Sequence, residues 1–183
     1  MSYIVLFCVS VYLGKAMITT MNRSEFKIFR NMQNISMLRG MTPFGEIIVA
    51  KSSSHIFGLW FVVEKPSIEL ITGDYINCET EYSDMKINEL LEAKNHSLVV
   101  CGTPIQIKTW QALYSIDRLV SYQELANLCG YPKATRAVAT AVSNNPIGIL
   151  IPCHRVIYKN GKIGRYLYGS DIKQKILISE QLI

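Results

Sequence analysis

Short runs of β-branched and aromatic residues mark the first hundred residues and predict strands. Two such runs, Glu46–Ala50 and Ile56–Val63, are separated by the polar segment Lys51–His55. Two strand-like runs joined by a short polar turn are typical of a β-hairpin. Residues 66–84 are rich in turn-forming residues, and residues 14–40 show little pattern.

The chain opens with a predominantly apolar run from Tyr3 to Leu13. These eleven residues fall well short of the ~20 needed to span a bilayer. No positive residue precedes the run and no clear small-residue cleavage site follows it, which disfavours a signal-peptide core. We therefore expect a buried strand here.

From Met85 onward, apolar residues have the spacing typical of helices. Apolar residues recur at helical intervals in Met85–Ala93, a short helix, and again from Ile105 to Tyr114. Between them, the turn-forming segment Cys101–Pro104 coincides with a change in charge balance. We place a domain boundary there, with one domain over 1–100 and a second over 101–183.

A pair of helices follows, joined by a short turn. Ser121 and Glu124 have the spacing of a capping box, and Gly130 followed by Pro132 ends the first helix. We expect Leu125 and Leu128 to face inward. Such a pair is typical of a helix-turn-helix, although many helix pairs are purely structural.

The second helix of the pair has one apolar face and one face of small residues around an arginine. The small face suits close approach to a DNA groove, with Arg136 as a probe, and favours shallow minor-groove docking over base reading. The apolar face consists of Ala134, Ala137, Val138, Ala141 and Val142, and the small face of Thr135, Arg136, Ala139, Thr140 and Ser143.

The net positive charge of the chain lies in its second half. Residues 101–183 carry 10 Lys and Arg against 4 Asp and Glu, whereas residues 1–100 carry 9 against 10. A basic patch confined to one half suggests a polyanion such as nucleic acid, although a solvated basic face is also common. The five cysteines show no CxxC spacing, which favours a reducing compartment over a disulfide scaffold.

One cysteine stands out by its neighbours. The apolar run Ile147–Ile151, which predicts a buried strand, ends at Pro152 and is followed by Cys153, His154 and Arg155. A cysteine is nucleophilic as thiolate, so it needs a base nearby. Adjacent residues of an extended chain point to opposite sides, so a bridging water or a tight turn is needed between thiol and imidazole.

A histidine base also needs a group that orients it, usually a carboxylate. Near the C-terminus, Lys173, Ile176, Leu177 and Glu180 share one face of a predicted helix. The cation and the carboxylate on that face are about two turns apart, roughly 10 Å. Their shared apolar surroundings predict partial burial and pairing.

Three kinds of cysteine site compete. A cysteine protease needs no basic half, and its base usually lies far from the nucleophile in sequence. A metal site needs more ligands than one Cys-His pair; Cys8, Cys78, His55 and His96 have no ligand spacing either. A thiol that acts on nucleic acid explains the basic patch, the helix pair and the cysteine together.

The stretch from Thr103 to Glu180 resembles the O6-alkylguanine-DNA alkyltransferases (methylated-DNA–protein-cysteine methyltransferases). The family signature Pro-Cys-His-Arg-Val is present as Pro152 to Val156, and VSYQELA, PKATRAVATA and the Lys173–Glu180 spacing also match. TPFGEIIV, from Thr42, resembles the start of the family's N-terminal domain.

The resemblance implies repair by self-alkylation: O6-alkylguanine, or O4-alkylthymine, is flipped out of double-stranded DNA and its alkyl group passes irreversibly to Cys153. His154 would deprotonate Cys153 through a water, oriented by Glu180. Tyr122 would donate to guanine N3, with Lys173 near it. Asn145 would hold the hinge before the nucleophile. The implied substrate-binding residues are Val156, Gly164, Tyr166, Leu167 and Tyr168, and the implied DNA-binding residues are Arg136, Thr135, Ala137, Ala139, Thr140 and Ser143.

The resemblance also implies an α/β fold: a small ribonuclease H-like N-terminal domain and a helical, winged-helix-like C-terminal domain. We expect a monomer without cofactor, metal or membrane contact, cytoplasmic in a prokaryote or nuclear in a eukaryote. A binding protein that senses the lesion without transfer is the alternative. The chain has Ala139, Thr140, Arg165 and Tyr168 where relatives often have glycine; Tyr168 either narrows the pocket rim or covers the surface.

Overall fold

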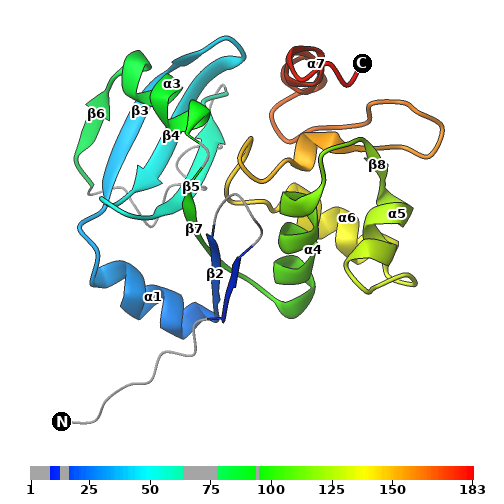
Figure 1. Ribbon diagram of the computed structural model, residues 1–183, viewed down its shortest axis with the longest axis horizontal. Helices are drawn as coiled ribbons and strands as arrows, with labels where there is room; N and C mark the ends of the chain where they lie inside the picture. The colour runs from blue at the N-terminus through cyan, green and yellow to red at the C-terminus, as the bar shows by residue number, and fades with distance from the viewer. Residues whose placement is uncertain (1–8, 13–16, 64–77, 94) are drawn as a thin grey trace.

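The computed structural model describes residues 9–12, 17–63, 78–93 and 95–183, and they form a sheet half and a helical half side by side (Figure 1). The sheet contains seven strands in the order β1-β2-β7-β5-β4-β3-β6. The strands are β1 (Val9–Tyr12), β2 (Met17–Met21), β3 (Ser36–Thr42), β4 (Gly45–Lys51), β5 (Ile56–Phe61), β6 (Thr80–Tyr82) and β7 (Ser97–Cys101).

The sheet is mixed, and its centre is a meander. Strands β3, β4 and β5 pair antiparallel, so the predicted hairpin on either side of Lys51–His55 is confirmed. Strand β7 returns parallel to both β2 and β5. Together with the helices, this sheet confirms the α/β class. The opening apolar run contributes β1, which pairs antiparallel with β2; residues 1–8 lie outside the described residues.

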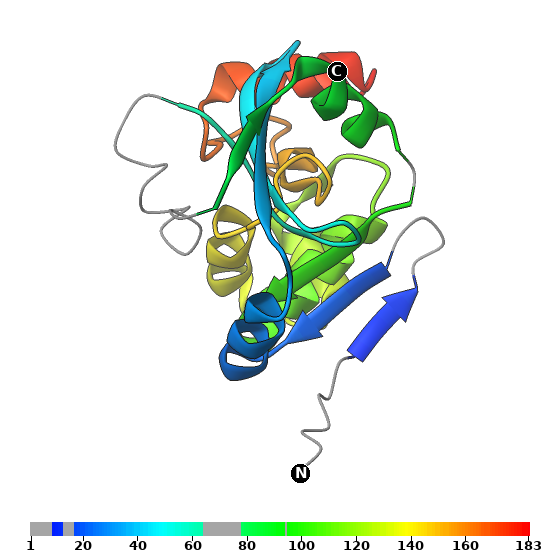
Figure 2. The ribbon, with the colours of Figure 1, turned by 90° about the vertical axis from the view of Figure 1, so that its left-hand side faces the viewer.

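Residues 14–40, where the sequence showed little pattern, contain regular elements. They form β2, helix α1 (Arg23–Asn31) and most of β3. Helix α1 has no fully buried residue and most of its residues are polar; its narrow apolar face, Phe26 and Phe29, is half-buried and packs against Phe57. Its sequence signal is the capping box between Asn22 and Glu25. Both ribbon views place α1 beside the β1–β2 end of the sheet (Figure 2).

The helices lie where the spacing of apolar residues predicts them. The helix expected at Met85–Ala93 is confirmed as α3, which lies on the sheet half. The helix expected from Ile105 is confirmed as α4, the first helix of the helical half. Trp110 Nε1 donates to the Ala141 carbonyl at 2.8 Å and joins α4 to α6. The elements are α3 (Asp84–Glu92), α4 (Pro104–Ser115), β8 (Val120–Ser121), α5 (Tyr122–Leu128), α6 (Thr135–Ser143), the 3-10 helix η2 (Cys153–Arg155), β9 (Val156–Ile157) and α7 (Ser170–Ser179).

The helix pair α5–α6 is present, with two corrections to the predicted inward faces. Leu128 is 56% exposed because α5 ends at this residue and the chain turns away at Gly130, which has a φ of 81°. Ala137 is exposed as well, whereas Val138 and Ala141 are buried. The buried stripe of this short helix is therefore narrower than its apolar composition suggests, and Ala137 belongs to the outer face.

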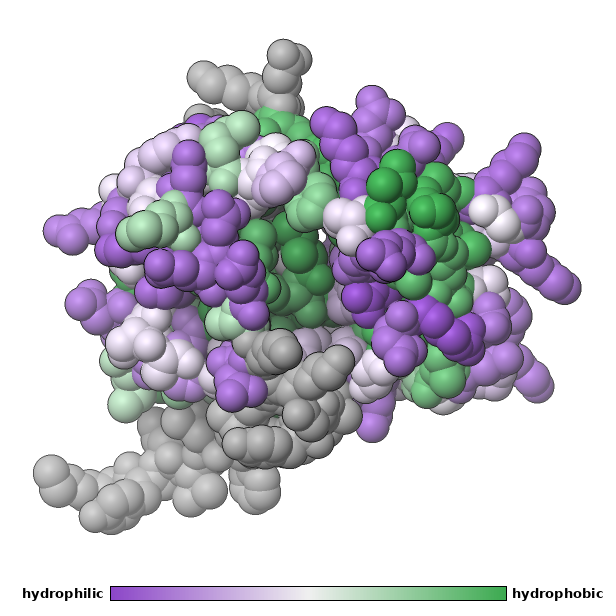
Figure 3. Space-filling view, turned by 45° about the horizontal axis from the view of Figure 1, so that its top comes forward, coloured by the Kyte–Doolittle hydropathy of each residue, from purple (hydrophilic) through white to green (hydrophobic). Residues whose placement is uncertain are grey.

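Apolar side chains fill the interior of both halves, and some remain at the surface. In the space-filling view apolar residues lie in the hollow between the halves, and more lie toward α7 (Figure 3). Exposed apolar residues of α7 and the segment after it are Ile178 and Ile183. No helix in the described part of the chain is both long and apolar enough to cross a membrane.

Candidate active site

The segment before Cys153 is a tight turn and not the predicted strand. Only Ile147 pairs with the sheet, through a single bridge to Leu59, and the chain then turns back. Ile149 adopts a φ of 62°, in the left-handed region that β-branched residues avoid. A short apolar run predicts burial equally well for a strand and for a packed turn, and here the turn forms.

Asn145 holds this turn together. Its side chain is 5% exposed; Nδ2 donates to the Ile151 carbonyl at 2.8 Å, and Oδ1 accepts from the Ile147 amide at 3.1 Å. Both ends of the turn are therefore tied to one amide side chain. These two hydrogen bonds therefore fix the position of Cys153, which follows the turn.

Cys153 begins the short helix η2 and is 7% exposed. Burial raises the pKa of its thiol, because a thiolate is poorly solvated there. The Asn145 amide, the Tyr166 phenol and the Lys173 ammonium act in the opposite direction and lower this pKa. The site thus holds a buried thiol beside groups that favour its ionised form.

His154 and Arg155, the next two residues of η2, both bind Glu180. Nε2 of His154 lies 3.1 Å from Oε1 of Glu180. The Arg155 guanidinium donates to both oxygens of the same carboxylate at 2.9 Å, and to the Ile116 carbonyl at 2.6 Å. The predicted pairing of His154 with Glu180 is therefore present, and Arg155 is a partner that the sequence did not reveal.

These contacts settle which histidine nitrogen carries a proton. Burial alone would raise the pKa of Glu180, but hydrogen bonds from His154 and Arg155 lower it to about 2. An ionised carboxylate only accepts hydrogen bonds, so Nε2 of His154 must be the donor. In the neutral imidazole Nδ1 then has the free lone pair, and it is buried without a hydrogen-bond partner among the described residues.

Lys173 is the other charged group beside the thiol. It is 1% exposed, and its ammonium donates to the Val156 carbonyl at 2.5 Å. Burial lowers the pKa of Lys173 to about 8, against a smaller opposing effect of Cys153. The hydrogen bond of this ammonium goes to the chain just after η2, and no described contact joins it to Tyr122.

A small pocket opens onto Cys153. Its volume is about 20 Å³, room for one water molecule. Of the residues expected to bind substrate, Tyr166, Leu167 and Tyr168 line it, whereas Val156 and Gly164 do not. The full lining is Tyr122, Val142, Ser143, Asn145, Cys153, Arg165, Tyr166, Leu167 and Tyr168.

The lining includes side chains that the sequence did not assign to the pocket. Val142 and Ser143 come from the end of α6, and Arg165 comes from the loop before α7. Burial raises the pKa of Tyr122, Tyr166 and Tyr168, so all three phenols stay protonated. The hydroxyls of Tyr166 and Tyr168 are buried without a hydrogen-bond partner in the described parts of the chain.

Helix α6 leads from the surface to this pocket. Arg136 and Thr140 are exposed, and the Arg136 guanidinium makes no hydrogen bond or ion pair within the described residues. Thr135 donates to Gln123 of α5 at 2.8 Å, which links the two helices. The exposed or half-buried positions of the helix are Thr135, Arg136, Ala137, Ala139, Thr140 and Ser143.

No group of three or more His, Cys, Asp or Glu side chains is placed to hold a metal ion in the described parts of the chain. Cys8, one of the four residues considered for zinc, lies outside those parts.

Known proteins of one family are similar to this chain in sequence and fold. The family described as 6-O-methylguanine DNA methyltransferase, DNA binding domain, matches residues 104–182. The methylated-DNA–protein-cysteine methyltransferase of Methanosarcina acetivorans is 47% identical over 146 residues, which are 74% of this chain and 92% of that protein. A Scheffersomyces stipitis protein of the same name is 44% identical over 85 residues, 45% of this chain and 44% of its own length.

A solved structure shares the fold. The crystal structure of Mycobacterium tuberculosis OGT in complex with DNA has a TM-score of 0.67 and 26% identity to this chain. The similarity covers 80% of this chain and 92% of that protein.

Proposed function

This chain belongs to the methylated-DNA–protein-cysteine methyltransferases, the O6-alkylguanine-DNA alkyltransferases, and we propose that it repairs alkylated DNA by transferring the alkyl group to its own Cys153. The substrate is O6-alkylguanine, or O4-alkylthymine, in double-stranded DNA. The observation that carries the proposal is the set of contacts around Cys153. A buried thiol lines a pocket next to a histidine whose free nitrogen and orientation are set by Glu180.

His154 is the general base. With Nε2 donating to Glu180, Nδ1 is the nitrogen that accepts the thiol proton. Nδ1 is buried and has no partner among the residues that the structure describes, which fits a bridging water between Nδ1 and the thiol, because an unpaired buried acceptor costs roughly 1–3 kcal/mol. The Lys173 ammonium supports the resulting thiolate.

The transfer is a displacement at the alkyl carbon. The Cys153 sulfur forms a bond to that carbon as the bond from carbon to O6 breaks, and the electron pair leaves with the guanine. Tyr122 lines the pocket as a protonated phenol and donates its hydrogen bond to N3 of the departing base. The protein retains a thioether, and because thioethers resist hydrolysis each molecule acts once.

The base reaches Cys153 by flipping out of the duplex. Helix α6 presents small side chains that allow close approach to the minor groove, and Arg136 occupies the gap left by the base. Val142 and Ser143 at the end of this helix line the pocket, so the path from groove to thiol is short. With a volume of about 20 Å³ the pocket must widen to admit a base.

At the level of the fold, we propose a ribonuclease H-like domain over 1–100 and a winged-helix-like domain over 101–183. The helix pair α5–α6 and the short parallel pair β8–β9 support the second assignment. We further propose that the protein acts as a monomer on DNA, in the cytoplasm of a prokaryote or the nucleus of a eukaryote. The non-catalytic alternative is less favoured, because it assigns no use to the contacts between His154 and Glu180.

The direct test is mass spectrometry after incubation with duplex DNA containing O6-methylguanine. Cys153 should gain about 14 Da, the mass added when S–H becomes S–CH₃. Peptide mapping should find the methyl group on Cys153 alone. A methyl group on Cys101 or Cys129 would overturn the assignment of the nucleophile.

The matched control is Cys153→Ala. This variant should bind the same DNA, because the proposed groove contacts come from α6, and it should gain no mass. Binding by the unmodified protein without any mass gain would favour the lesion-sensing alternative.

A further inference from the structure

The ring of Tyr168 is buried and has close neighbours in Phe61, Tyr166 and Gly148. It is 6% exposed, and its centroid lies 5.2 Å from that of Phe61 and 5.4 Å from that of Tyr166. The backbone of Gly148 is also near, and an added Cβ there would lie 3.7 Å from Cε2 of the ring. The tyrosine therefore packs in the interior and does not merely cover the surface.

Tyr168 also lines the pocket that it shares with Cys153. Because that pocket has a volume of about 20 Å³, any displacement of the ring changes the available space substantially. Phe61 and Tyr166 pack against the ring and restrict its movement. Of the three neighbours, Phe61 comes from the sheet.

Phe61 is itself held rigidly. It is the last residue of β5, is 1% exposed, and pairs with Ile47 of β4. The same strand is bonded to the turn before the nucleophile: the Leu59 amide donates to the Pro146 carbonyl at 3.0 Å, and the Gly148 amide donates to the Leu59 carbonyl at 2.8 Å. Strand β5 and the turn that delivers Cys153 thus form one hydrogen-bonded unit.

We infer that Phe61, which lies outside the pocket, is a positioning residue that limits the size of the O6 substituent by holding Tyr168 beside Cys153. The inference rests on the proposed function and adds a substrate class to it. Small alkyl groups such as methyl are accepted, and bulky groups such as benzyl are excluded. The selectivity is built by a contact between the sheet half and the helical half.

The test uses free bases, so that DNA binding plays no part. Rates of Cys153 alkylation by O6-methylguanine and by O6-benzylguanine are measured for the unmodified protein and for Phe61→Leu. The smaller leucine leaves room into which the Tyr168 ring can withdraw. The ratio of benzyl to methyl rate should rise roughly tenfold or more.

The matched control is Phe57→Leu. Phe57 lies in the same strand and is 2% exposed, but its ring packs against Phe26 and Phe29 of α1 and not against Tyr168. This variant loses the same atoms from the same sheet, and its rate ratio should stay unchanged. An equal rise in Phe57→Leu would show general loosening of the fold and would overturn the inference.

The ratio separates positioning from loss of stability, since unfolding lowers both rates together. If Phe61→Leu does not fold, the same ratio of benzyl to methyl rate is measured for Phe61→Met, which keeps a long apolar side chain. An unchanged ratio in a folded variant contradicts the role of Phe61. If the unmodified protein takes no alkyl group from any substrate, the proposed function itself fails.

Discussion

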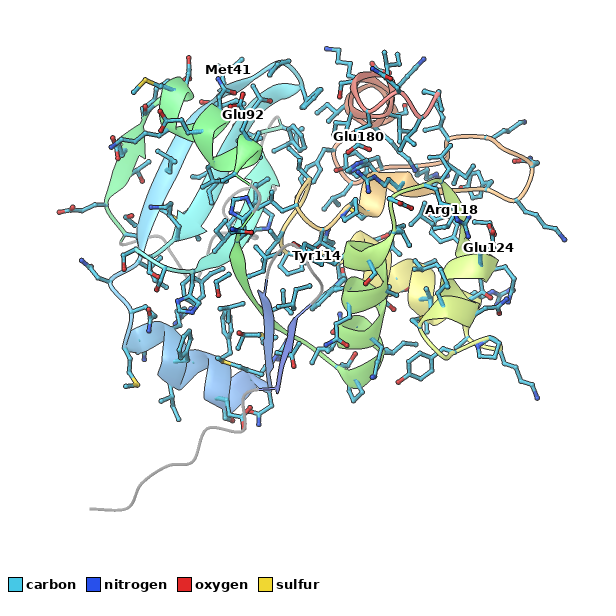
Figure 4. All side chains as sticks on the ribbon, in the orientation of Figure 1. Met41, Glu92, Tyr114, Arg118, Glu124 and Glu180 are labelled. Atoms are coloured by element: carbon cyan, nitrogen blue, oxygen red, sulfur yellow. The ribbon has the colours of Figure 1, made fainter. Side chains whose placement is uncertain are left out.

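Arg155 and Glu180 are joined by two hydrogen bonds, Nε to Oε2 and Nη2 to Oε1, each 2.9 Å long. The paired geometry fixes the plane of the carboxylate, and Oε1 also receives Nε2 of His154. Glu180 lies below α7, on the side that faces the rest of the helical half (Figure 4). Arg155 therefore fixes the orientation of Glu180, and Glu180 in turn orients His154.

The first prediction concerns the stability of this ion pair. Arg155→Met should lower the free energy of unfolding by about 1–3 kcal/mol, because Glu180 and the Ile116 carbonyl each lose a charged donor. Urea denaturation measures the change. The pair Arg118–Glu124 is the control: its side chains are 59% and 51% exposed, against 21% and 25% for Arg155 and Glu180. Arg118→Ala should cost less than about 0.5 kcal/mol, and an equal cost for both changes would contradict the prediction.

The second prediction is that the free energy of unfolding falls at acidic pH as Glu180 becomes protonated. The pKa of Glu180 is about 2 in the folded protein, below its ordinary value of 4.5. Its contribution to stability is therefore present above about pH 4.5 and is lost as the pH falls toward 2. Free energies of unfolding measured across this range should fall more steeply for the unmodified protein than for Glu180→Gln. Parallel curves would show that Glu180 is not the titrating group.

The third prediction concerns Lys173 and the rate of transfer. Its ammonium lowers the pKa of Cys153, but Lys173 itself has a pKa of about 8 and is neutral above it. The rate advantage of the unmodified protein over Lys173→Met should be largest below pH 8 and should shrink as the pH rises. Single-turnover rates on methylated DNA from acidic to alkaline pH measure this. Lys175→Met removes the same charge from an exposed position of the same helix and should show no such trend.

The fourth prediction separates DNA flipping from chemistry. Arg136→Ala should slow repair of duplex DNA far more than the reaction with free O6-methylguanine, since the arginine stabilises only the flipped state, by a few kcal/mol. Its side chain is exposed and unbonded among the described residues, so stability should not change. Lys27→Ala on α1 controls for the loss of one exposed cation. Equal losses on both substrates would place Arg136 in the chemistry or in folding.

Local patterns predicted most of the elements that position the site. Periodicity and caps located α3, α4 and the pair α5–α6, because burial of one face leaves a regular trace in sequence. Helix α1 is harder to predict, because most of its residues are polar and its narrow apolar face consists of Phe26 and Phe29, which pack against Phe57. The run Ile147–Ile151 forms a turn and not the predicted strand, because apolar content indicates burial but not backbone direction.

The chemical groups of the site can be read from local features of the chain: the order Cys153, His154, Arg155 and the helical spacing of Lys173 and Glu180. Which of these groups meet depends on how the chain folds. Arg155 reaches Glu180 across 25 positions, and Phe61 meets Tyr168 across the two halves of the molecule. Contacts between distant segments depend on how the sheet and helices pack, and this packing leaves no periodic signal at the residues that take part.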